Sequence, residues 1–342
     1  MSIASEGLRS VWRGAAGVAL TGVLLWLSAC RRDSQADVVP SAAAAPSAST
    51  PASLPKADLV PIPVPGRLVL VGDLHGDLDV ARRALKLAGA TDERGKWTGG
   101  NQVLVLLGDL LDRGEQERAL LDWVSELEVA APAAGGRLVV LLGNHEAMNV
   151  AGDLRYVTSS GLRDFASFAP ADGATAFGDA APASTWGRLA AFLPGGPYAR
   201  KLAAHPAIAV VGDTLVVHGG LLPEHVRYGL GRVNREFNQW MLGSAPPSLA
   251  ITSERSPLWV RDFGERKVPK EACAKLDEVL TASSARRMVI GHSVQDKGID
   301  PACHDKVWRI DVGLSRFYGG PLQLLEITAA GPRVLSAEPA AH

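Results

Sequence analysis

The sequence carries almost no net charge and has no run of basic residues. Its 35 Lys and Arg residues against 36 Asp and Glu residues give a formal charge of −1 at pH 7. Proteins that bind nucleic acid usually carry a basic patch or stripe that meets the phosphate backbone. We therefore expect no nucleic-acid partner for this chain. No internal repeat is visible in the 342 residues.

The chain also lacks an apolar run long enough to cross a membrane. The candidate run, residues 14–27, has 14 residues, whereas a helix needs roughly 17 to 25 to span a bilayer core. Arg9 and Arg13 precede this run and Cys30 follows it closely, an arrangement typical of a secretory signal peptide. We therefore expect the run to direct export rather than to form a permanent membrane helix.

The residues that follow the apolar run, Leu-Ser-Ala-Cys at 27–30, resemble the lipobox of bacterial lipoproteins. This resemblance implies cleavage before Cys30 and diacylation of its sulfur, which would anchor the protein to a membrane through lipid. The alternative is a plain secretory signal that is cut after Ala29. Arg31, rather than Asp, follows Cys30, which resembles lipoproteins sorted to an outer membrane. We expect a protein of the cell envelope that faces the periplasm.

The next segment contains almost no bulky apolar side chains. Residues 40–55 are all Ala, Pro, Ser or Thr except Leu54, and such a composition does not offset the entropy lost on ordering. The remaining length is enough for one large α/β domain with a buried core. We predict a lipoprotein signal peptide at 1–29, a disordered Ala/Pro/Ser-rich tether at 30–66, one folded domain at 67–330 and a C-terminal tail at 331–342.

Five predicted strands each lead into residues that bind metal ions well. The apolar runs 68–71, 103–107, 138–142, 215–217 and 288–290 are predicted to be buried strands. They are followed by Asp73 and His75, Asp109, Asn144, His218 and His292, respectively. In open α/β sheets, ligands bind outside the carboxyl ends of the strands. Oxygen and imidazole ligands without thiolates, delivered by five strand ends, indicate a hydrolytic site with two metal ions.

Helical patterns follow the early strands, and a hairpin pattern occurs later. Residues 77–88 and 115–130 carry apolar side chains at helical spacing, and residues 208–217 contain two short strands around Gly212 and Asp213. We therefore predict an α/β fold in which two mixed β-sheets pack as a sandwich flanked by helices.

Five motifs, in order along the chain, resemble a known family. They are Gly-Asp-x-His-Gly at 72–76, Gly-Asp-x-x-Asp-Arg-Gly at 108–114, Gly-Asn-His-Glu at 143–146, His-Gly-Gly at 218–220 and Gly-His at 291–292. Together they resemble the calcineurin-like metallophosphoesterases, whose αββα fold agrees with the predicted sandwich. The complete Asp-Arg-Gly and Asn-His-Glu forms resemble the phosphoprotein phosphatase branch. Residues 143–157, 257–261 and 291–295 are similar to the Shewanella-like protein phosphatases.

The chemistry of these residues and the resemblance imply the same metal ligands. One ion would be held by Asp73, His75 and Asp109, and a second by Asn144, His218 and His292 around the shared Asp109. We expect divalent manganese, iron or zinc. Two such ions lower the pKa of a bridging water, and the resulting hydroxide would be the nucleophile.

The other site residues are expected to act on the substrate. His145 is the candidate general acid, and Asp112 is expected to hold its second ring nitrogen. Arg113 and Arg261 would bind the phosphate oxygens, because a planar guanidinium matches phosphate better than an ammonium does. Asn144 is also a candidate for substrate binding.

Structural roles remain alternatives for some of these residues. An aspartate after a strand often caps a helix, and Glu146 is expected either to serve the site or to stabilise its own turn. Arg261, whose motif is looser, could instead form a structural ion pair. Asp153, Arg155 and Tyr156 are expected either to line the pocket or to lie on a surface helix.

The two remaining cysteines are expected to pair with each other. Once Cys30 is acylated, Cys273 and Cys303 form an even pair in an oxidising compartment, and a disulfide is the simplest expectation. Cys303 and Arg309 also have the Cys-x5-Arg spacing of cysteine-based phosphatases. That chemistry needs a glycine-rich loop entering a helix, whereas residues 307–312 alternate like a strand and contain no glycine. We therefore do not expect a catalytic thiol.

The sequence thus predicts an exported, lipid-anchored phosphomonoesterase. Its substrates would be phosphoproteins, at Ser, Thr or Tyr, or small phosphorylated metabolites. One alternative is a phosphodiesterase or dinucleoside-polyphosphate hydrolase that uses the same metal ions. Another is a non-catalytic surface lipoprotein that kept the fold, which would be expected to have lost ligands. The sequence shows no such loss.

Overall fold

The computed structural model describes residues 58–64, 66–178 and 181–337. The predicted signal peptide, the predicted lipidation site Cys30 and most of the predicted tether lie outside the described residues. Within the described part of the chain, none of the helices has the length and apolar character needed to span a bilayer.

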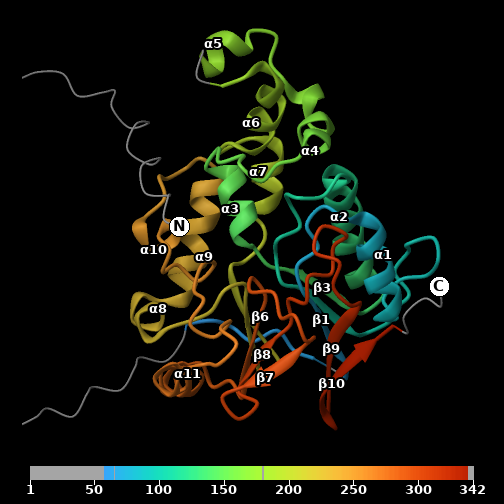
Figure 1. The fold of residues 1–342 in the computed structure, drawn as a ribbon, viewed down its shortest axis with the longest axis vertical. Helices are drawn as coiled ribbons and strands as arrows, with labels where there is room; N and C mark the ends of the chain where they lie inside the picture. The colour runs from blue at the N-terminus through green and yellow to red at the C-terminus, as the bar shows by residue number, and fades with distance from the viewer. Residues whose placement is uncertain (1–57, 65, 179–180, 338–342) are drawn as a thin grey trace, which may run out of the picture. The chain divides into compact units, whose positions relative to one another are not determined.

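The described strands form two five-stranded sheets (Figure 1). The first sheet has the order β10-β9-β1-β2-β3, in which β1, β2 and β3 are parallel and β9 and β10 are antiparallel to their neighbours. Its strands are β1 (Leu68–Val71), β2 (Val103–Leu106), β3 (Arg137–Val140), β9 (Gln323–Thr328) and β10 (Gly331–Ser336).

The second sheet has the order β4-β5-β6-β8-β7. Its central strands β5, β6 and β8 are parallel, and the edge strands β4 and β7 are antiparallel to them. Its strands are β4 (Ile208–Val211), β5 (Thr214–Val217), β6 (Arg287–Ile290), β7 (Asp300–Ala302) and β8 (Val307–Arg309). The predicted hairpin at 208–217 is confirmed as the antiparallel pair β4 and β5.

Alternation along the strands explains how the two sheets pack. Leu68 and Val105 of the first sheet belong to one apolar cluster with Val216 and Val289 of the second sheet. Successive side chains of a strand point to opposite faces, so the neighbouring residues, such as Val69, pack against helices instead. The central strands are therefore buried on both faces, and the predicted α/β sandwich of two mixed sheets is confirmed.

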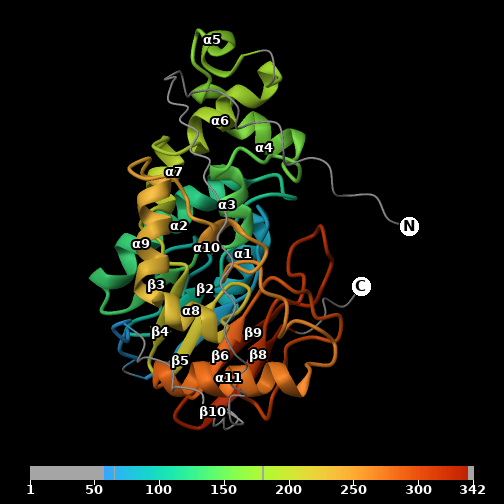
Figure 2. The ribbon, with the colours of Figure 1, turned by 90° about the vertical axis from the view of Figure 1, so that its left-hand side faces the viewer.

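Helices cover the outer faces of the sandwich. Helices α1 and α2 pack on the first sheet, and α8, α9 and α11 lie over the second (Figures 1 and 2). The larger helices are α1 (Leu78–Leu87), α2 (Glu117–Ala133), α9 (Leu230–Met241) and α11 (Lys270–Ser283). The shorter ones are α3 (Asn144–Val150), α4 (Ser159–Asp164), α5 (Gly173–Phe177), α6 (Trp186–Phe192), α7 (Pro197–Leu202), α8 (Pro223–Tyr228) and α10 (Leu249–Thr252), with 3₁₀ turns η1 (Ala166–Phe168) and η2 (Ala183–Thr185).

The start of α1 illustrates how local sequence sets an element boundary. Asp77 caps the helix, because its carboxylate accepts a hydrogen bond from the Val80 amide at 3.0 Å. Leu85 and its buried neighbours then face the core along one side of the helix. The predicted helix at 77–88 is thus present with nearly the predicted bounds.

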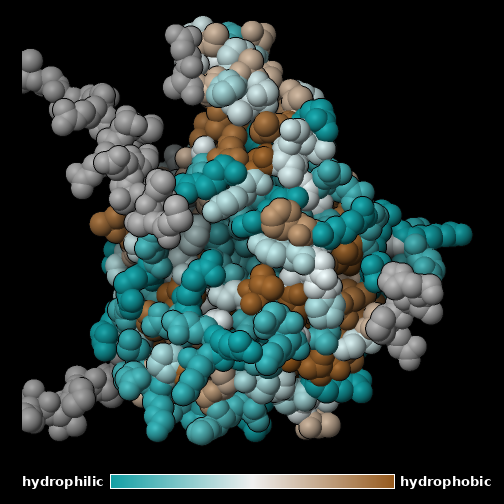
Figure 3. Space-filling view, in the orientation of Figure 1, coloured by the Kyte–Doolittle hydropathy of each residue, from teal (hydrophilic) through white to brown (hydrophobic). Residues whose placement is uncertain are grey.

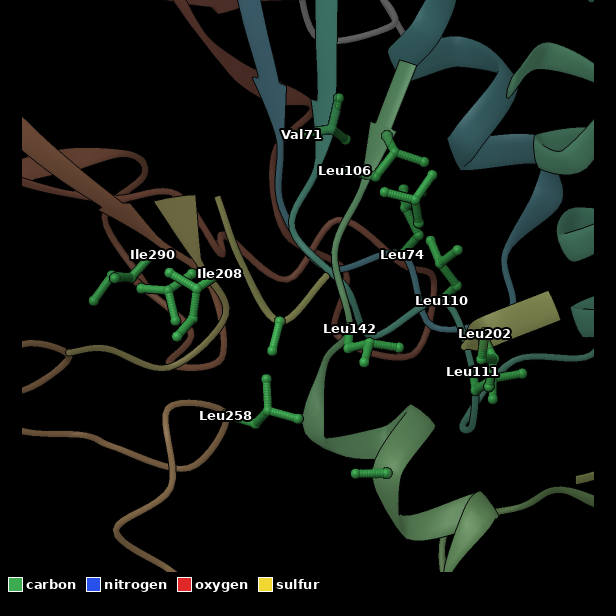
Figure 4. Packing of buried hydrophobic residues seen from close by; sticks show 14 of the residues in the cluster. Val71, Leu74, Leu106, Leu110, Leu111, Leu142, Leu202, Ile208, Leu258 and Ile290 are labelled. Atoms are coloured by element: carbon green, nitrogen blue, oxygen red, sulfur yellow. The ribbon is translucent and has the colours of Figure 1, made fainter. Parts of the chain in front are cut away.

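The loops after the strands are anchored by apolar side chains. Figure 4 shows Val71, Leu106 and Leu142, near the ends of β1, β2 and β3, together with Leu74 and Leu110 of the following loops. All five side chains are essentially inaccessible to solvent. Because the polar residues of these loops alternate with buried leucines, their backbones are held firmly against the core.

Both ends of the folded domain extend beyond the predicted bounds of 67 and 330. Within the predicted tether, the Ile62 amide donates to the Val210 carbonyl at 2.7 Å, and Ile62 packs against the core between the sheets. Within the predicted tail, Gly331–Ser336 forms strand β10, which pairs with β9. Its proline is tolerated because β10 is an edge strand, and that composition hid the strand from the sequence pattern.

Figure 3 shows hydrophilic residues over most of one face of the molecule, with apolar residues reaching the surface in separate patches.

A disulfide joins Cys273 on α11 to Cys303, next to β7, and the two Cα atoms lie 5.3 Å apart. It links α11 to the edge of the second sheet across 30 residues of sequence.

Candidate metal centre

Loops from both sheets bring histidine and aspartate side chains to one place. His75, Asp109 and His145 form one group, and Asp109, His218 and His292 form another. Within each group, the atoms that could bind an ion all lie within 4.8 Å of one another. Asp109 belongs to both groups, so its carboxylate is the point that they share.

The Asp109 carboxylate is surrounded by imidazole rings. Its Oδ2 lies 3.3 Å from Nε2 of His218, 3.8 Å from Nε2 of His145 and 3.9 Å from Nε2 of His75. All four side chains are at least 95 % buried. Asp109 Oδ1 is used separately, as it accepts a hydrogen bond from the His145 amide at 2.9 Å.

Asp73 and Asn144, the other two expected ligands, lie beside these groups. Asn144 Oδ1 is 2.9 Å from Nε2 of His218, and Asp73 Oδ1 is 4.0 Å from Nδ1 of the same ring. The Asp73 carboxylate also accepts a hydrogen bond from the His292 amide at 3.1 Å. The structure therefore brings together all six side chains that the sequence nominated as ligands.

Hydrogen bonds on the far side of two rings leave Nε2 facing the site. Nδ1 lies 3.1 Å from the Leu111 carbonyl in His75 and 2.8 Å from the Leu107 carbonyl in His218. A nitrogen that faces a carbonyl carries a proton, so when either ring is neutral its lone pair lies on Nε2, the arrangement common in metal-binding histidines.

His292 gives an independent sign that the residues fit a metal ion. Its Nε2 is buried and, among the described residues, has no hydrogen-bond partner. A buried polar atom without a partner costs free energy, and a metal ion would remove that cost. With carboxylate, amide and imidazole donors on the same cluster, the side chains fit divalent metal ions.

The charges of the cluster depend on burial and on the neighbouring carboxylates. Burial lowers the pKa of His75 to about 4 and, with the charge of His218, that of His292 to about 2, which keeps both rings neutral. Burial alone would also lower the pKa of His218, but Asp109 and Asp73 outweigh it and raise the pKa to about 10. In the metal-free protein, His218 therefore balances the buried carboxylates, and metal binding would displace its proton.

Glu146 stabilises the loops rather than facing the cluster. Its carboxylate accepts hydrogen bonds from the backbone amides of Gly143 at 2.7 Å, Asp109 at 2.8 Å, Leu110 at 2.9 Å and Leu111 at 3.2 Å. These amides belong to the two loops that follow β2 and β3. Of the two roles considered for Glu146, the structural one agrees with these contacts.

Five site residues have left-handed backbone conformations. The φ angles are 44° for His75, 49° for Asp109, 67° for Asp112, 67° for Arg113 and 65° for His292. Such conformations cost about 1–3 kcal/mol each and persist where the surroundings enforce them. They cluster at this site, as backbone strain often does at functional sites.

Glycines allow the two central loops to approach each other closely. A Cβ atom on Gly108, which has φ +94°, would collide with the backbone of Gly143, and one on Gly143 would collide with the Asp109 carboxylate. The glycines in the two motifs are therefore required by the packing of one loop against the other.

His145 and Asp112 form the contact that the sequence predicted. Nδ1 of His145 lies 2.6 Å from Asp112 Oδ2, and both side chains are buried. Burial opposes protonation of His145, but Asp109 and Asp112 outweigh it and raise the pKa of the imidazole. The ring is thereby suited to carry a proton, whereas a metal ligand must be neutral.

Arg113 lies among three aromatic rings at the edge of the cluster. Its guanidinium carbon is 4.6 Å from the ring centroid of Tyr156, 5.0 Å from that of Phe317 and 5.3 Å from that of Tyr318. The three rings are 39 %, 59 % and 38 % exposed. Tyr156 was a candidate from the sequence, whereas Phe317 and Tyr318 were missed because only the fold brings them to Arg113.

The other candidates near Tyr156 do not line the site. Asp153 and Arg155 form an ion pair with each other at 2.7 Å, and the Arg155 side chain is largely exposed. They fit the surface alternative that the sequence left open.

Arg261 lies on the other side of the cluster, beside His292. Its Nη1 is 3.4 Å from the His292 carbonyl and 3.3 Å from Oγ of Ser293. Within residues 58–64, 66–178 and 181–337, neither Arg113 nor Arg261 has a carboxylate within 4.0 Å. Both guanidinium charges are therefore available to an anionic ligand.

Asp311 is a buried carboxylate that the sequence reasoning missed. It lies against Asp73, accepts a hydrogen bond from the Gly313 amide at 2.9 Å, and burial raises its pKa to about 6. Asp311 follows strand β8 closely, so it continues the pattern of polar residues after strand ends. That pattern offered a signal, but residues 307–312 were interpreted only as a strand.

Glu146→Ala is expected to destabilise the metal-free protein by about 3–5 kcal/mol, because it leaves up to four buried amides without their acceptor. Urea unfolding monitored by circular dichroism measures this loss. Glu126→Ala, at an exposed position of α2, is the control and should change the free energy of unfolding by no more than about 0.5 kcal/mol. A loss below about 1 kcal/mol for Glu146→Ala would contradict the role given to this carboxylate.

Comparisons with known proteins agree with this geometry. Residues 66–296 match the family model described as calcineurin-like phosphoesterase. The chain is 39 % identical over 307 residues to Shewanella-like protein phosphatase 2 of Arabidopsis thaliana, covering 80 % of this chain and 78 % of the relative. It is 27 % identical to Shewanella-like protein phosphatase 1 of Plasmodium berghei, covering 75 % and 70 %.

A solved structure supports the same fold. The cold-active protein-tyrosine phosphatase of a psychrophilic Shewanella species superposes with a TM-score of 0.64 at 24 % identity, covering 81 % of this chain and 83 % of that one. The family and the His/Asp cluster together imply divalent metal ions. This chain belongs to the calcineurin-like metallophosphoesterases and is a phosphatase of that family.

Proposed function

We propose that this phosphatase hydrolyses phosphate monoesters, and aryl phosphates in particular, at a centre that holds two metal ions. The observation that carries the proposal is the position of Asp109, whose buried carboxylate lies within 4.8 Å of a ring nitrogen of His75 and, in a second group, of ring nitrogens of His218 and His292. A carboxylate with two oxygens is suited to bridge two cations, as in hydrolytic two-metal sites.

The chain's own residues divide into two ligand sets. Asp73, His75 and Asp109 would hold one ion, and Asn144, His218, His292 and the shared Asp109 would hold the other. Manganese, iron or zinc suits such a mixture of carboxylate, amide and imidazole ligands. When bound, the ions activate water for attack on phosphorus and neutralise the charge of the phosphate.

Two arginines would bind the phosphate from different sides. Arg113 lies near the first ligand group, because its neighbour Tyr318 has its ring centroid 5.4 Å from that of His75. Arg261 lies beside His292 of the second group. A terminal phosphate has enough free oxygens for both guanidinium groups, which favours a monoester over a diester.

His145 would protonate the leaving oxygen. When the bond from phosphorus to that oxygen breaks, the oxygen takes the proton from the imidazole, whose Nε2 faces Asp109 and whose Nδ1 faces Asp112. Asp112 stabilises the protonated ring until the transfer occurs.

The three partly exposed rings around Arg113 favour an aromatic leaving group. Tyr156 also lies close to His145, with ring centroids 5.2 Å apart, so these rings border the place where the leaving group departs. Aromatic rings pack favourably against one another at such distances. The name of the similar Shewanella protein, a protein-tyrosine phosphatase, points to the same class of substrate.

Chelation is expected to abolish hydrolysis of 4-nitrophenyl phosphate, and Asp109→Asn should lower kcat at least 100-fold even with metal restored, because the shared ligand is lost. Release of 4-nitrophenol measures both effects. Asp153→Asn, at the surface ion pair, is the matched control and should retain activity. Activity that survives both chelation and Asp109→Asn would refute the metal assignment, and faster turnover of bis(4-nitrophenyl) phosphate would favour the diesterase alternative.

Phe317→Ala is expected to lower kcat/KM roughly tenfold for phosphotyrosine, since an aromatic contact contributes about 1 kcal/mol beyond its buried area. The value for phosphoserine should stay within about twofold. Leu249→Ala, which removes an exposed apolar side chain elsewhere, provides the control. Equal losses for the aryl and alkyl substrates would contradict an aryl-binding role for Phe317.

We also propose that the protein is exported and anchored by lipid on Cys30, facing the periplasm at the outer membrane. The signal-like residues before Cys30 support this proposal, and the Cys273–Cys303 disulfide suits an oxidising compartment.

In a bacterium with two membranes, the wild-type protein should sediment with the outer membrane and carry the mass of a diacylglyceryl group, whereas Cys30→Ser should lack that mass. Fractionation and intact-mass spectrometry measure both properties. Cys273→Ser is a control that leaves Cys30 in place. A wild-type protein that keeps its first 29 residues and carries no lipid would refute the anchor.

A further inference from the structure

Arg188 on α6 is a completely buried arginine close to the site. Its guanidinium contacts four acceptors: Asn149 Oδ1 at 2.7 Å, the Gly161 carbonyl at 3.0 Å, Asp112 Oδ1 at 3.2 Å and Glu117 Oε2 at 2.6 Å. The side chain is 0 % exposed. Burying a guanidinium is costly unless it is fully paired, and here each of its three nitrogens has a partner.

Aromatic rings cover the same guanidinium. Its carbon lies 5.1 Å from the ring centroid of Phe165 and 4.9 Å from that of Phe192. Both rings are fully buried. They exclude water, so the electrostatic interactions of Arg188 with its carboxylate partners are strong.

Arg188 also determines the orientation of Asn149. Because Nε of Arg188 donates to Oδ1, the amide nitrogen of Asn149 must point the other way, where it donates to Asp112 Oδ1 at 2.9 Å and to the His145 carbonyl at 2.9 Å. A reversed amide would place two donors against each other. Arg188 therefore acts on Asp112 both directly and through Asn149.

These contacts divide the two oxygens of Asp112. Oδ1 accepts from Arg188 and Asn149, and Oδ2 is left for Nδ1 of His145 at 2.6 Å. Rotation of the carboxylate would break the charge-assisted hydrogen bond from Arg188 and the hydrogen bond from the Asn149 amide. The orientation of Asp112, and with it the position of the His145 imidazole, is therefore fixed.

We propose that Arg188 is a positioning residue for catalysis, which holds Asp112 and thereby aims His145 at the leaving oxygen. This inference rests on the proposed function, in which His145 is the general acid. It makes α6, which lies outside the two sheets (Figure 2), part of the catalytic apparatus. No motif in the sequence connects Arg188 to the site.

Glu117 must be considered when the contact is tested. It shares Arg188 with Asp112, and burial raises its pKa to about 6 despite the arginine. Removing Arg188 alone would leave two buried carboxylates without a counter-charge, which is strongly destabilising. The test variant is therefore the double substitution Glu117→Gln with Arg188→Met, and Arg188→Lys is the conservative variant.

The experiment measures kcat of the metal-loaded enzyme for aryl phosphates whose leaving groups differ in pKa. A general acid contributes most where the leaving group is poor. The double variant is expected to lose no more than about threefold with 4-nitrophenyl phosphate but about 30-fold with phenyl phosphate, with KM nearly unchanged. Arg188→Lys should lie in between, because an ammonium keeps the charge beside Asp112 but cannot contact every acceptor.

The second readout is the proton NMR spectrum of the zinc-loaded protein. The Nδ1 proton of His145, shared with Asp112 in a short hydrogen bond, should give a downfield resonance that is absent from His145→Gln. The double variant should shift or lose this resonance. This readout does not require turnover, so it tests the contact even if the proposed substrates are wrong.

Arg118→Met is the matched control. Arg118 stacks on Phe168 at 5.2 Å and donates to the Asp164 carbonyl, so its loss loosens the same group of helices without touching Asp112. This variant should keep the leaving-group dependence and the resonance of the wild type.

Two outcomes would overturn the role of Arg188, and a third would distinguish that role from the proposed function. A folded double variant with the wild-type leaving-group dependence and resonance would overturn the role of Arg188. An equal change in Arg118→Met would also overturn it, because the effect would then reflect general loosening of the helices. If the wild type hydrolyses no monoester but the double variant alone loses the resonance, the proposed function fails and the positioning contact stands.

Discussion

The structure depends on the placement of one buried carboxylate, that of Asp109, between imidazole rings. One of its oxygens faces His75, His145 and His218 within 3.9 Å. A buried carboxylate is costly without compensating charge, and opposite charges beside it hold its pKa well below the usual value. The fold must therefore supply positive charge at this point, from protonated histidines or from bound cations.

The architecture of the two sheets makes this placement possible. Parallel strands β1, β2 and β3 of one sheet and β5 and β6 of the other end near the same point, and each is followed at once by a polar loop. The Glu146 carboxylate ties two of these loops together, and Gly108 and Gly143 let their backbones approach. The leucines between the polar residues are buried in the sandwich, and the free energy gained from their burial offsets the cost of the strained backbone at the site.

The site residues that could be predicted from the sequence are those that directly follow a recognisable strand. Asp109 and His218 follow continuous apolar runs, and a ligand after a buried strand can be recognised without knowing how the sheets pack. By contrast, Arg188 and Phe317 reach the site only through tertiary packing of segments with no periodic signal. Asp311 lies between these two cases. The strand before it was predicted, but Asp311 was not proposed as a site residue that follows that strand.

The bounds of the domain also depend partly on local sequence and partly on contacts with residues distant in sequence. Strands β1, β2, β3, β5 and β6, which precede the expected metal ligands, were predicted to within two residues, because a continuous run of buried apolar residues leaves few alternatives. Strand β9, which lies between β1 and β10, and the edge strand β7 were not predicted. The edge strand β10 contains Pro332 and Arg333 and is held by pairing with β9, which the sequence cannot reveal. Ile62 likewise joins the sheet through a partner distant in sequence.

The most direct test of the two-metal assignment is anomalous diffraction from crystals of the protein loaded with manganese or zinc. Two peaks are expected, one on each side of the Asp109 carboxylate, the first next to Asp73 and His75 and the second next to Asn144, His218 and His292. A single peak, or peaks away from Asp109, would contradict it.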